Sequence, residues 1–372
     1  MESFEAIDRL LDQAIAEGHF SGAAYALGNR DRFWTGYRGR VSLRPDAPAV
    51  GPDTLWDMAS VTKVMATTPA AMLLCDDGSM HLEQPVADLL ETFREGDRRW
   101  VKIRDLLLHE SGLPAYATLT DTPGPEAAIA KALRLKFAYE TGKDTVYSCI
   151  GFVTLWRCVE KACGTTMPNL LRERLYEPLG MRSTLYLPTA EGRRRCAATE
   201  KLDDGRRKLE QSRNLVSPDP EYIQGVVHDP VALCVGGVSG NAGLFSTAED
   251  TARYLQMLLR RGAGPNGQLI CARTVELWTR RNSPRSTRAL GWDTKSPEGS
   301  SAGTKFSLAS FGHTGYTGTC VWVDPENGLF AALLTNRVHP TSTRFEAFAP
   351  VRPKFHDLAF DLIGPKPADR AG

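Results

Sequence analysis

Segments with the pattern of β-strands lie at the two ends of this chain, and helix-like segments fill its middle. Near the amino terminus, two short runs around a polar turn predict a hairpin, at residues 21–28 and 32–36. Near the carboxyl terminus, turns separate three more predicted strands, at residues 305–311, 318–323 and 329–335. Apolar residues at helical spacing add a first and a last helix, within residues 3–16 and 354–362. Since these strands share one core only if the termini meet, the pattern predicts a sheet assembled from both ends of the chain.

The middle of the chain has helical periodicity at residues 61–77, 101–109, 126–137, 149–163 and 168–176, and again at 247–261 and 270–280. Residues 183–230 are polar and weakly patterned, which predicts an extended loop region. The fold class is therefore α/β, of the α+β type. We expect a sheet region formed by residues 1–65 and 245–365, a mainly helical region at residues 66–244, and a ligand site in the crevice between them.

Composition and charge exclude several classes of function. The 45 basic and 44 acidic side chains give a net charge of +1, so neither nucleic acid nor an anionic membrane is indicated as a partner. The first twenty residues hold five acidic side chains and no apolar run, unlike a signal peptide. We therefore expect a soluble cytoplasmic protein, although removal of a leader would leave the same sequence. The eight cysteines form no C-x-x-C pair and no zinc-like spacing, which predicts reduced thiols and no metal site.

Ser60 and Lys63 form the sharpest local motif. Ser60 stands where an apparent strand enters a helix, and residues three apart on a helix share a face, so the lysine amine can reach the hydroxyl. A serine hydroxyl becomes a strong nucleophile only when a neighbour takes its proton, and a lysine does this only with a lowered pKa. The alternative is an ordinary helix cap beside a surface lysine. No other lysine in the chain has a serine three positions before it.

Two further segments carry candidate groups. Tyr147, which precedes Ser148 and Cys149, would shuttle protons if it lay near Lys63; otherwise it is a buried tyrosine with a bonded hydroxyl. The segment Gly312–Gly315 ends a predicted strand, where small residues let an extended substrate approach closely. The N–H of Tyr316 could form an oxyanion hole with that of Ser60. Alone, this segment is also an ordinary glycine-rich turn.

Taken in order, Ser60-x-x-Lys63, Tyr147-Ser148-x and His313-Thr314-Gly315 resemble the S-x-x-K, Y-x-N and K/H-T-G boxes of the penicillin-recognising serine hydrolases. That family includes class C β-lactamases, D-alanyl-D-alanine carboxypeptidases and esterases of the same fold. Three other stretches are also similar to it, at residues 106–114, 176–181 and 236–247. The resemblance spans residues 5–340 and implies an antiparallel sheet flanked by helices beside an all-α region.

The resemblance also implies roles for single residues. Ser60 would be the acylated nucleophile, Lys63 its base and Tyr147 the proton relay, most of all during deacylation. His313 would supply a hydrogen-bond donor or positive character to the substrate, with Thr314 and Gly315 shaping the strand. The second box normally ends in Asn, which contacts the lysine and the substrate amide. Here it ends in Cys149, a weak donor that cannot replace both bonds.

These features predict a serine hydrolase that acts through an acyl-enzyme on a small ester or amide. Esters are favoured because the amide-recognising Asn is absent; D-amino-acid peptides or amides and β-lactams follow. A non-catalytic penicillin-binding, acyl-binding or scaffold protein of the same fold is the alternative from another class. Acyl transfer by Ser60 and Lys63 needs no metal or organic cofactor, so none is predicted, and the sequence indicates no oligomeric state.

Overall fold

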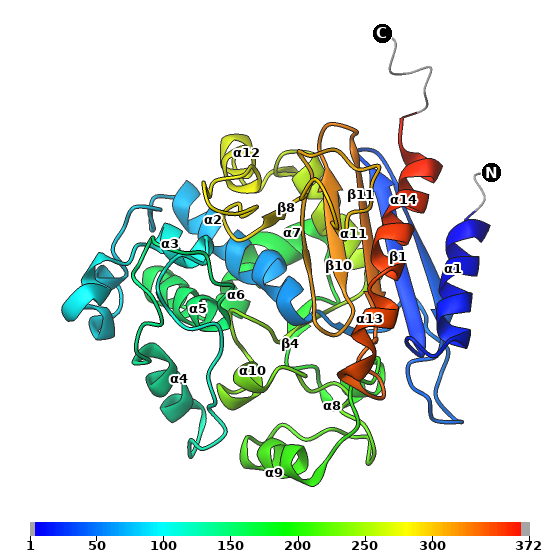
Figure 1. Ribbon diagram of the computed structural model, residues 1–372, viewed down its shortest axis with the longest axis horizontal. Coiled ribbons are helices and arrows are strands. Elements are labelled where there is room, and N and C mark those ends of the chain that lie inside the picture. Colours follow the sequence, from blue (N-terminus) through cyan, green and yellow to red (C-terminus); the bar gives the residue numbers. More distant parts are fainter. Residues whose placement is uncertain (1–3, 366–372) are drawn as a thin grey trace.

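The computed structural model describes residues 4–365. Its main sheet has six strands in the order β2-β1-β11-β10-β9-β8, and every neighbouring pair is antiparallel. The strands are β1 (Gly22–Asn29), β2 (Phe33–Gly39), β8 (Asp293–Thr294), β9 (Phe311–Thr314), β10 (Cys320–Asp324) and β11 (Leu329–Thr335). The pairing of β1 with β11, in which Ala26 lies opposite Ala332, joins the two ends of the chain. The sheet predicted from both termini is therefore confirmed (Figure 1).

Helices cover both faces of this sheet (Figure 1). On one face lie α1 (Glu5–Ala16) and α14 (Val351–Ile363); on the other lies α11 (Ala248–Leu259). Side chains of β1 alternate accordingly. Tyr25 and Leu27 pack in the cluster that includes Leu11 and Phe355, whereas Ala24 and Ala26 face the main core. This period of two places β1 between two apolar layers, which explains its nearly continuous hydrophobic sequence.

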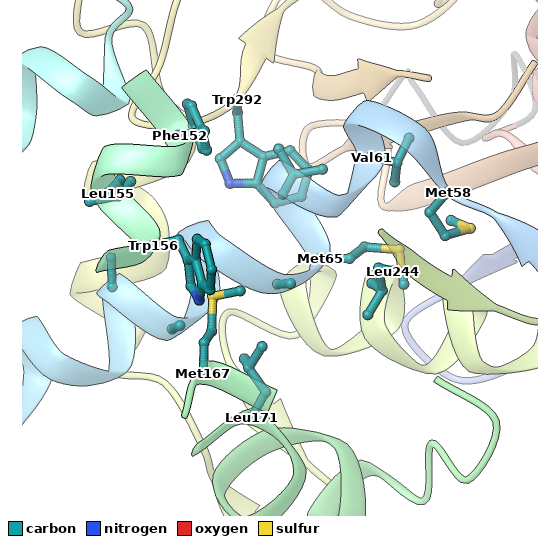
Figure 2. Packing of buried hydrophobic residues seen from close by; sticks show 14 of the residues in the cluster. Met58, Val61, Met65, Phe152, Leu155, Trp156, Met167, Leu171, Leu244 and Trp292 are labelled. Atoms are coloured by element: carbon teal, nitrogen blue, oxygen red, sulfur yellow. The ribbon is translucent and has the colours of Figure 1, made fainter. Parts of the chain in front are cut away.

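The mainly helical part packs around α5 (Cys149–Cys163), whose bounds match the predicted helix. Figure 2 shows Phe152, Leu155 and Trp156 of α5 gathered with Met65 and Trp292 in one cluster. The other helices of this part are α2 (Thr68–Asp76), α3 (Ile103–Leu107), α4 (Pro125–Leu133), α6 (Met167–Leu171), α7 (Glu177–Leu179) and α10 (Pro230–Cys234). The cluster also holds residues of the sheet, such as Phe330. The division at residues 65 and 245 stays a prediction, and residues 1–3 of the first predicted region lie outside the described part of the chain.

The predicted strand at residues 305–311 is wrong. Lys305 and Ser307 instead direct their backbone N–H groups to the carboxylates of Asp357 and Asp324, which leaves the segment outside the ladder. The strand β9 begins only at Phe311 and includes the glycine and histidine that the sequence suggested as a turn. The polar side chains that hold residues 305–310 have no periodic pattern, so propensity alone misplaced the strand.

The predicted loop at residues 183–230 is also partly structured. It contains β4 (Leu185–Tyr186), α8 (Ala190–Arg194) and α9 (Asp204–Ser212). The side chains of Thr189 and Asp203 cap the two helices by accepting backbone N–H groups. Both helices are polar on most sides, so a hydrophobic period could not reveal them.

The remaining elements are short or lie near the chain ends. They are β3 (Trp56–Asp57), β5 (Leu244–Ser246), β6 (Ala263–Gly264), β7 (Gly267–Gln268), α12 (Ala272–Thr279) and α13 (Phe345–Phe348). The strands β3, β5 and β4 form a small second sheet, and its strand β3 directly precedes the Ser60 turn. Among residues 4–365, no helix has the length and apolar character needed to cross a bilayer.

Candidate active site

Ser60 lies in a tight 3₁₀ turn, Ala59–Val61, that follows β3. Ala59 has φ = +46°, a left-handed conformation that an alanine adopts only when its surroundings enforce it. The carboxylate of Asp57 accepts the Ala59 N–H at 2.8 Å, and the carbonyl of Met58 accepts the hydroxyl of Thr319 at 2.9 Å. The chain immediately before Ser60 is thus fixed by buried hydrogen bonds, one of them from the hairpin of the third box.

Lys63 reaches Ser60 as the three-residue spacing predicted. Its Nζ donates to Ser60 Oγ at 3.1 Å and to the carbonyl of Asn241 at 2.9 Å, while Cys149 Sγ lies 3.8 Å away. The side chain is fully buried, and Nζ lies 4.9 Å from the centre of the Tyr147 ring. The surface-lysine alternative is therefore excluded by its burial.

Three consecutive segments replace the single helix predicted at residues 61–77. After the 3₁₀ turn, Lys63–Thr67 is π-helical, and α2 begins at Thr68 with Pro69 in its first turn. Pro69 donates no backbone N–H to the preceding turn, and the carbonyls of Val64 and Met65 accept the hydroxyls of Tyr254 and Tyr176 instead. The wider π-turn, a feature often found at functional sites, accommodates Pro69 without breaking the path of the chain.

A lysine base needs a lowered pKa, whereas the pKa of Lys63 is raised. Desolvation lowers the pKa of Lys63, but the acidic groups of Cys149 and Tyr147 raise it by more, so the net shift is upward. The resting site therefore holds an ammonium group that donates to Ser60. Lys63 must lose this proton before it accepts the one on the serine hydroxyl.

Tyr147 lies at the centre of the polar cluster. The centre of its ring is 4.7 Å from that of His109 and 5.9 Å from that of His313. The Arg288 guanidinium carbon lies 5.2 Å from the same ring. Two cations, Lys63 and Arg288, thus lie near the aromatic ring that joins the second box to the third. The Tyr147 phenol lies close to Lys63 and to the third box, as a proton relay requires.

His313 does not have the donor character that the resemblance implied. Its Nδ1–H donates to the carbonyl of Thr314 at 2.8 Å, and its buried Nε2 has no hydrogen-bond partner among the described residues. Burial, together with the positive charges of Arg288 and Lys63, holds the pKa of His313 well below its ordinary value. The ring is neutral, so Nε2 carries a lone pair and acts as an acceptor.

Gly315 closes the third box with very little space around it. Its N–H donates to the carbonyl of Thr319 at 2.7 Å, and a Cβ at this position would lie 2.0 Å from Thr319 Oγ1. The next residue, Tyr316, is 56% exposed; its ring is stacked against that of His228, and the guanidinium carbon of Arg337 lies 4.4 Å from the ring centre. The oxyanion role of the Tyr316 and Ser60 N–H groups stays a prediction.

These groups open into one cleft of about 740 Å³. It is lined by the catalytic candidates Ser60 and Tyr147, by the third box with Tyr316, and by three arginines, Arg288, Arg337 and Arg352. None of these arginines forms a salt bridge with a described carboxylate. Arg352 donates to the carbonyls of Gly315 and Thr319, which fixes the backbone of the third box.

Several groups of the site were not predicted. The three arginines and His109 carried no assigned role, although His109 lies in a stretch that resembles the family. Asn241 lies in another such stretch, but it serves Lys63 through a backbone carbonyl, for which a sequence gives no side-chain signal. All eight cysteines are free thiols, and among the described residues no group of three His, Cys, Asp or Glu side chains could hold a metal ion.

Known proteins are similar to this chain in sequence. The Beta-lactamase family model matches residues 7–352. An N-acetylmuramyl-L-alanine amidase of Bacillus subtilis strain 168 is 34% identical over 361 residues, which cover 90% of this chain and 80% of the relative. A protein of Escherichia coli strain K12 with the provisional name D-alanyl-D-alanine carboxypeptidase is 32% identical, covering 82% of this chain and 73% of its own.

Solved structures agree on the fold. A class C β-lactamase superposes with a TM-score of 0.74 at 18% identity, covering 98% of this chain and 97% of the other. A penicillin-binding protein homologue from Caulobacter crescentus gives 0.74 at 20% identity, with 97% of both chains covered.

A serine hydrogen-bonded to a lysine three residues later, in a cleft beside an antiparallel sheet, is typical of the S-x-x-K class of serine hydrolases. The protein is an enzyme of that class. The family match covers most of the chain, so the chain belongs to the beta-lactamase family.

Proposed function

We propose that the protein hydrolyses an amide bond of a small anionic acyl compound through a covalent intermediate on Ser60. The observation that carries this proposal is the 3.1 Å contact between Ser60 Oγ and Lys63 Nζ in a cleft lined by three arginines. The names of two relatives support an amide: one is called an N-acetylmuramyl-L-alanine amidase and the other a D-alanyl-D-alanine carboxypeptidase.

The reaction follows from the positions of three side chains. Ser60 Oγ attacks the carbonyl carbon while its proton passes to deprotonated Lys63. Collapse of the tetrahedral intermediate breaks the C–N bond, and the leaving nitrogen takes a proton relayed through Tyr147. Water then attacks the acyl-enzyme ester, gives its proton to the same relay, and releases the carboxylic acid with Ser60 restored.

The charge of the cleft favours a substrate with a carboxylate or similar anion. Arg288 lies beside Tyr147, and Arg337 and Arg352 lie near the third box, without ion pairs to described carboxylates. A guanidinium in a partly desolvated cleft binds a carboxylate strongly and with defined geometry. The one acidic lining residue, Asp293, has Oδ1 bonded to the Thr287 hydroxyl.

Ester hydrolysis is the second candidate, and Cys149 favours it, since the Asn that contacts a substrate amide is absent. The structure offers a partial substitute, because the Asn241 carbonyl gives Lys63 a second hydrogen bond. Only the contact to the substrate amide is then missing. We therefore place amides ahead of esters, in the reverse order of the sequence-based expectation.

The test is the intact mass of the protein after exposure to a fluorophosphonate, a penicillin and a p-nitrophenyl ester, followed by turnover of a matched ester and anilide that carry a carboxylate. The parent should form an adduct, and Ser60→Ala should form none. The control Ser212→Ala, which alters an exposed serine, should form the same adduct as the parent. Turnover of the anilide supports the amidase, and turnover of the ester alone supports the esterase. A folded parent with no adduct from any probe supports the non-catalytic binding protein.

A further inference from the structure

His109 is a buried residue with an unusual backbone. It follows α3, its φ is +61°, and its side chain is 1% exposed. A left-handed conformation is uncommon for residues other than glycine, although Asn, Asp and His adopt it more often than most. Such a backbone persists only where surrounding contacts determine it. The contacts of His109 therefore indicate what the conformation serves.

Those contacts lie on both sides of Tyr147. The carbonyl of His109 accepts the N–H of Val146 at 2.9 Å, and its Nδ1 accepts the N–H of Ser148 at 3.0 Å. The hydroxyl of Tyr139 donates to the same carbonyl at 2.9 Å. One residue thus holds the backbone immediately before and immediately after Tyr147, through its main chain and its side chain respectively.

The imidazole also contacts the relay residue directly. Its ring centre lies 4.7 Å from that of Tyr147 and 5.1 Å from that of Phe152. Because Nδ1 accepts a hydrogen bond, the proton of the neutral ring is on Nε2. Burial and the charges of Arg288 and Lys63 hold the pKa of His109 well below its ordinary value, so the acceptor at Nδ1 persists at neutral pH.

We propose that His109 is the positioning residue of the Tyr147 relay: its left-handed backbone and its Nδ1 acceptor clamp the chain on both sides of Tyr147 and hold the phenol beside Lys63. This inference rests on the proposed acyl-enzyme reaction and adds to it the residue that sets the relay geometry. His109 touches neither Ser60 nor the substrate region of the cleft, so its effect passes through Tyr147.

Two substitutions separate the acceptor from the backbone conformation. His109→Gly adopts positive φ freely but accepts no bond from Ser148. His109→Asn tolerates the same φ. The Asn Oδ1 is separated from Cα by the same number of bonds as the histidine Nδ1, so it can accept the Ser148 N–H. The matched control is Leu187→Gly, which relieves another left-handed residue (φ = +51°) outside the cleft.

The measurement is rapid-mixing and steady-state kinetics with a p-nitrophenyl ester, beside Tyr147→Phe. Tyr147→Phe should slow deacylation more than acylation, so that a burst precedes a slow steady state. His109→Gly should show the same burst and a steady-state rate about 10- to 100-fold lower, since small misplacements of catalytic groups have effects of this size. Because only deacylation slows, KM should fall together with kcat and leave kcat/KM nearly unchanged. His109→Asn should recover most of the rate, and Leu187→Gly should match the parent.

The decisive readout is the double variant. If His109 acts through Tyr147, adding His109→Gly to Tyr147→Phe should slow turnover less than about 2-fold further, because the two changes remove the same function. Losses that multiply, or a His109→Gly variant that turns over like the parent, would overturn the inference and leave the proposed function intact. A parent that forms no Ser60 adduct would overturn the proposed function itself. Should the glycine variant not fold, His109→Ala removes the acceptor with a small side chain, and Ala59 shows that alanine adopts a positive φ in this chain.

Discussion

Replacing Gly315 by alanine tests how closely the third box packs against the nucleophile turn. The added Cβ would lie 2.0 Å from Thr319 Oγ1 and 2.7 Å from the carbonyl of Met58. Thr319 must then move, which breaks its 2.9 Å hydrogen bond to that carbonyl. Since Met58 is two residues before Ser60, the displacement reaches the nucleophile directly.

The size of the effect can be worked out from two contributions. Overpacking in a close-packed site costs about 1–3 kcal/mol, and loss of the Thr319 bond costs about 0.5–1.5 kcal/mol. The free energy of unfolding should therefore fall by about 3 kcal/mol. With an unfolding entropy of about 2.1 cal/mol/K per residue, a chain of 372 residues should melt about 4 °C lower. Acylation of Ser60 should slow by about 10- to 100-fold.

The assay is thermal unfolding followed by calorimetry, with the rate of fluorophosphonate labelling measured in parallel. Gly51→Ala is the control, since its nearest atom beyond the chain neighbours is 3.5 Å away. In a Thr319→Ala background the worst overlap is absent, so adding Gly315→Ala should lower the melting temperature by less than about 2 °C. If Gly315→Ala melts and labels like Gly51→Ala in the parent background, the close packing of the two segments is refuted.

Two further outcomes are expected. In Cys149→Asn, an amide contact is restored near Lys63, so the ratio of anilide to ester turnover should rise about 10-fold, the equivalent of one hydrogen bond; an unchanged ratio would show that Cys149 does not set this preference. Hydrogen bonds from His228 and Ser342 lower the pKa of Glu200 to about 2, below the 4.5 of a free glutamate. A depressed folded-state pKa gives stability that is present above pH 4.5 and is lost as pH falls toward 2. The difference in melting temperature between the parent and Glu200→Gln should therefore shrink from pH 6 to pH 3, and a constant difference would contradict the linkage.

Local patterns predicted the elements that carry an apolar signal in their own sequence. The strands β1 and β11 are nearly continuous apolar runs, the apolar residues of α5 repeat with a helical period, and a polar turn marks the hairpin of β1 with β2. The strand β9 was misplaced because the segment before it is held by Asp324 and Asp357, carboxylates from other parts of the chain. Bonds of this kind depend on tertiary structure and leave no periodic trace.

The candidate site was also predicted only in part: its residues were identified from the sequence, but their charge states were not. The order of the three boxes and their resemblance to the family grouped Ser60, Lys63, Tyr147 and His313. In the structure Lys63 and His313 lie near the Tyr147 ring, and Lys63 donates to Ser60. Their charge states could not be predicted. The neutral form of His313 results from burial and from cations that other segments contribute, and the ammonium form of Lys63 results from its acidic neighbours.

The pairing of β1 with β11 has a consequence for synthesis on the ribosome. The hairpin of β1 and β2 is complete once residue 39 has emerged, but its partner strand ends only at Thr335, about 300 residues later. At about 5–20 residues per second, the open edge of β1 waits roughly 15 to 60 s for β11. During that interval the nascent chain presents an unpaired, apolar strand edge, which is a template for association with other chains. The fold therefore requires the growing chain to protect its first strand until its last one arrives.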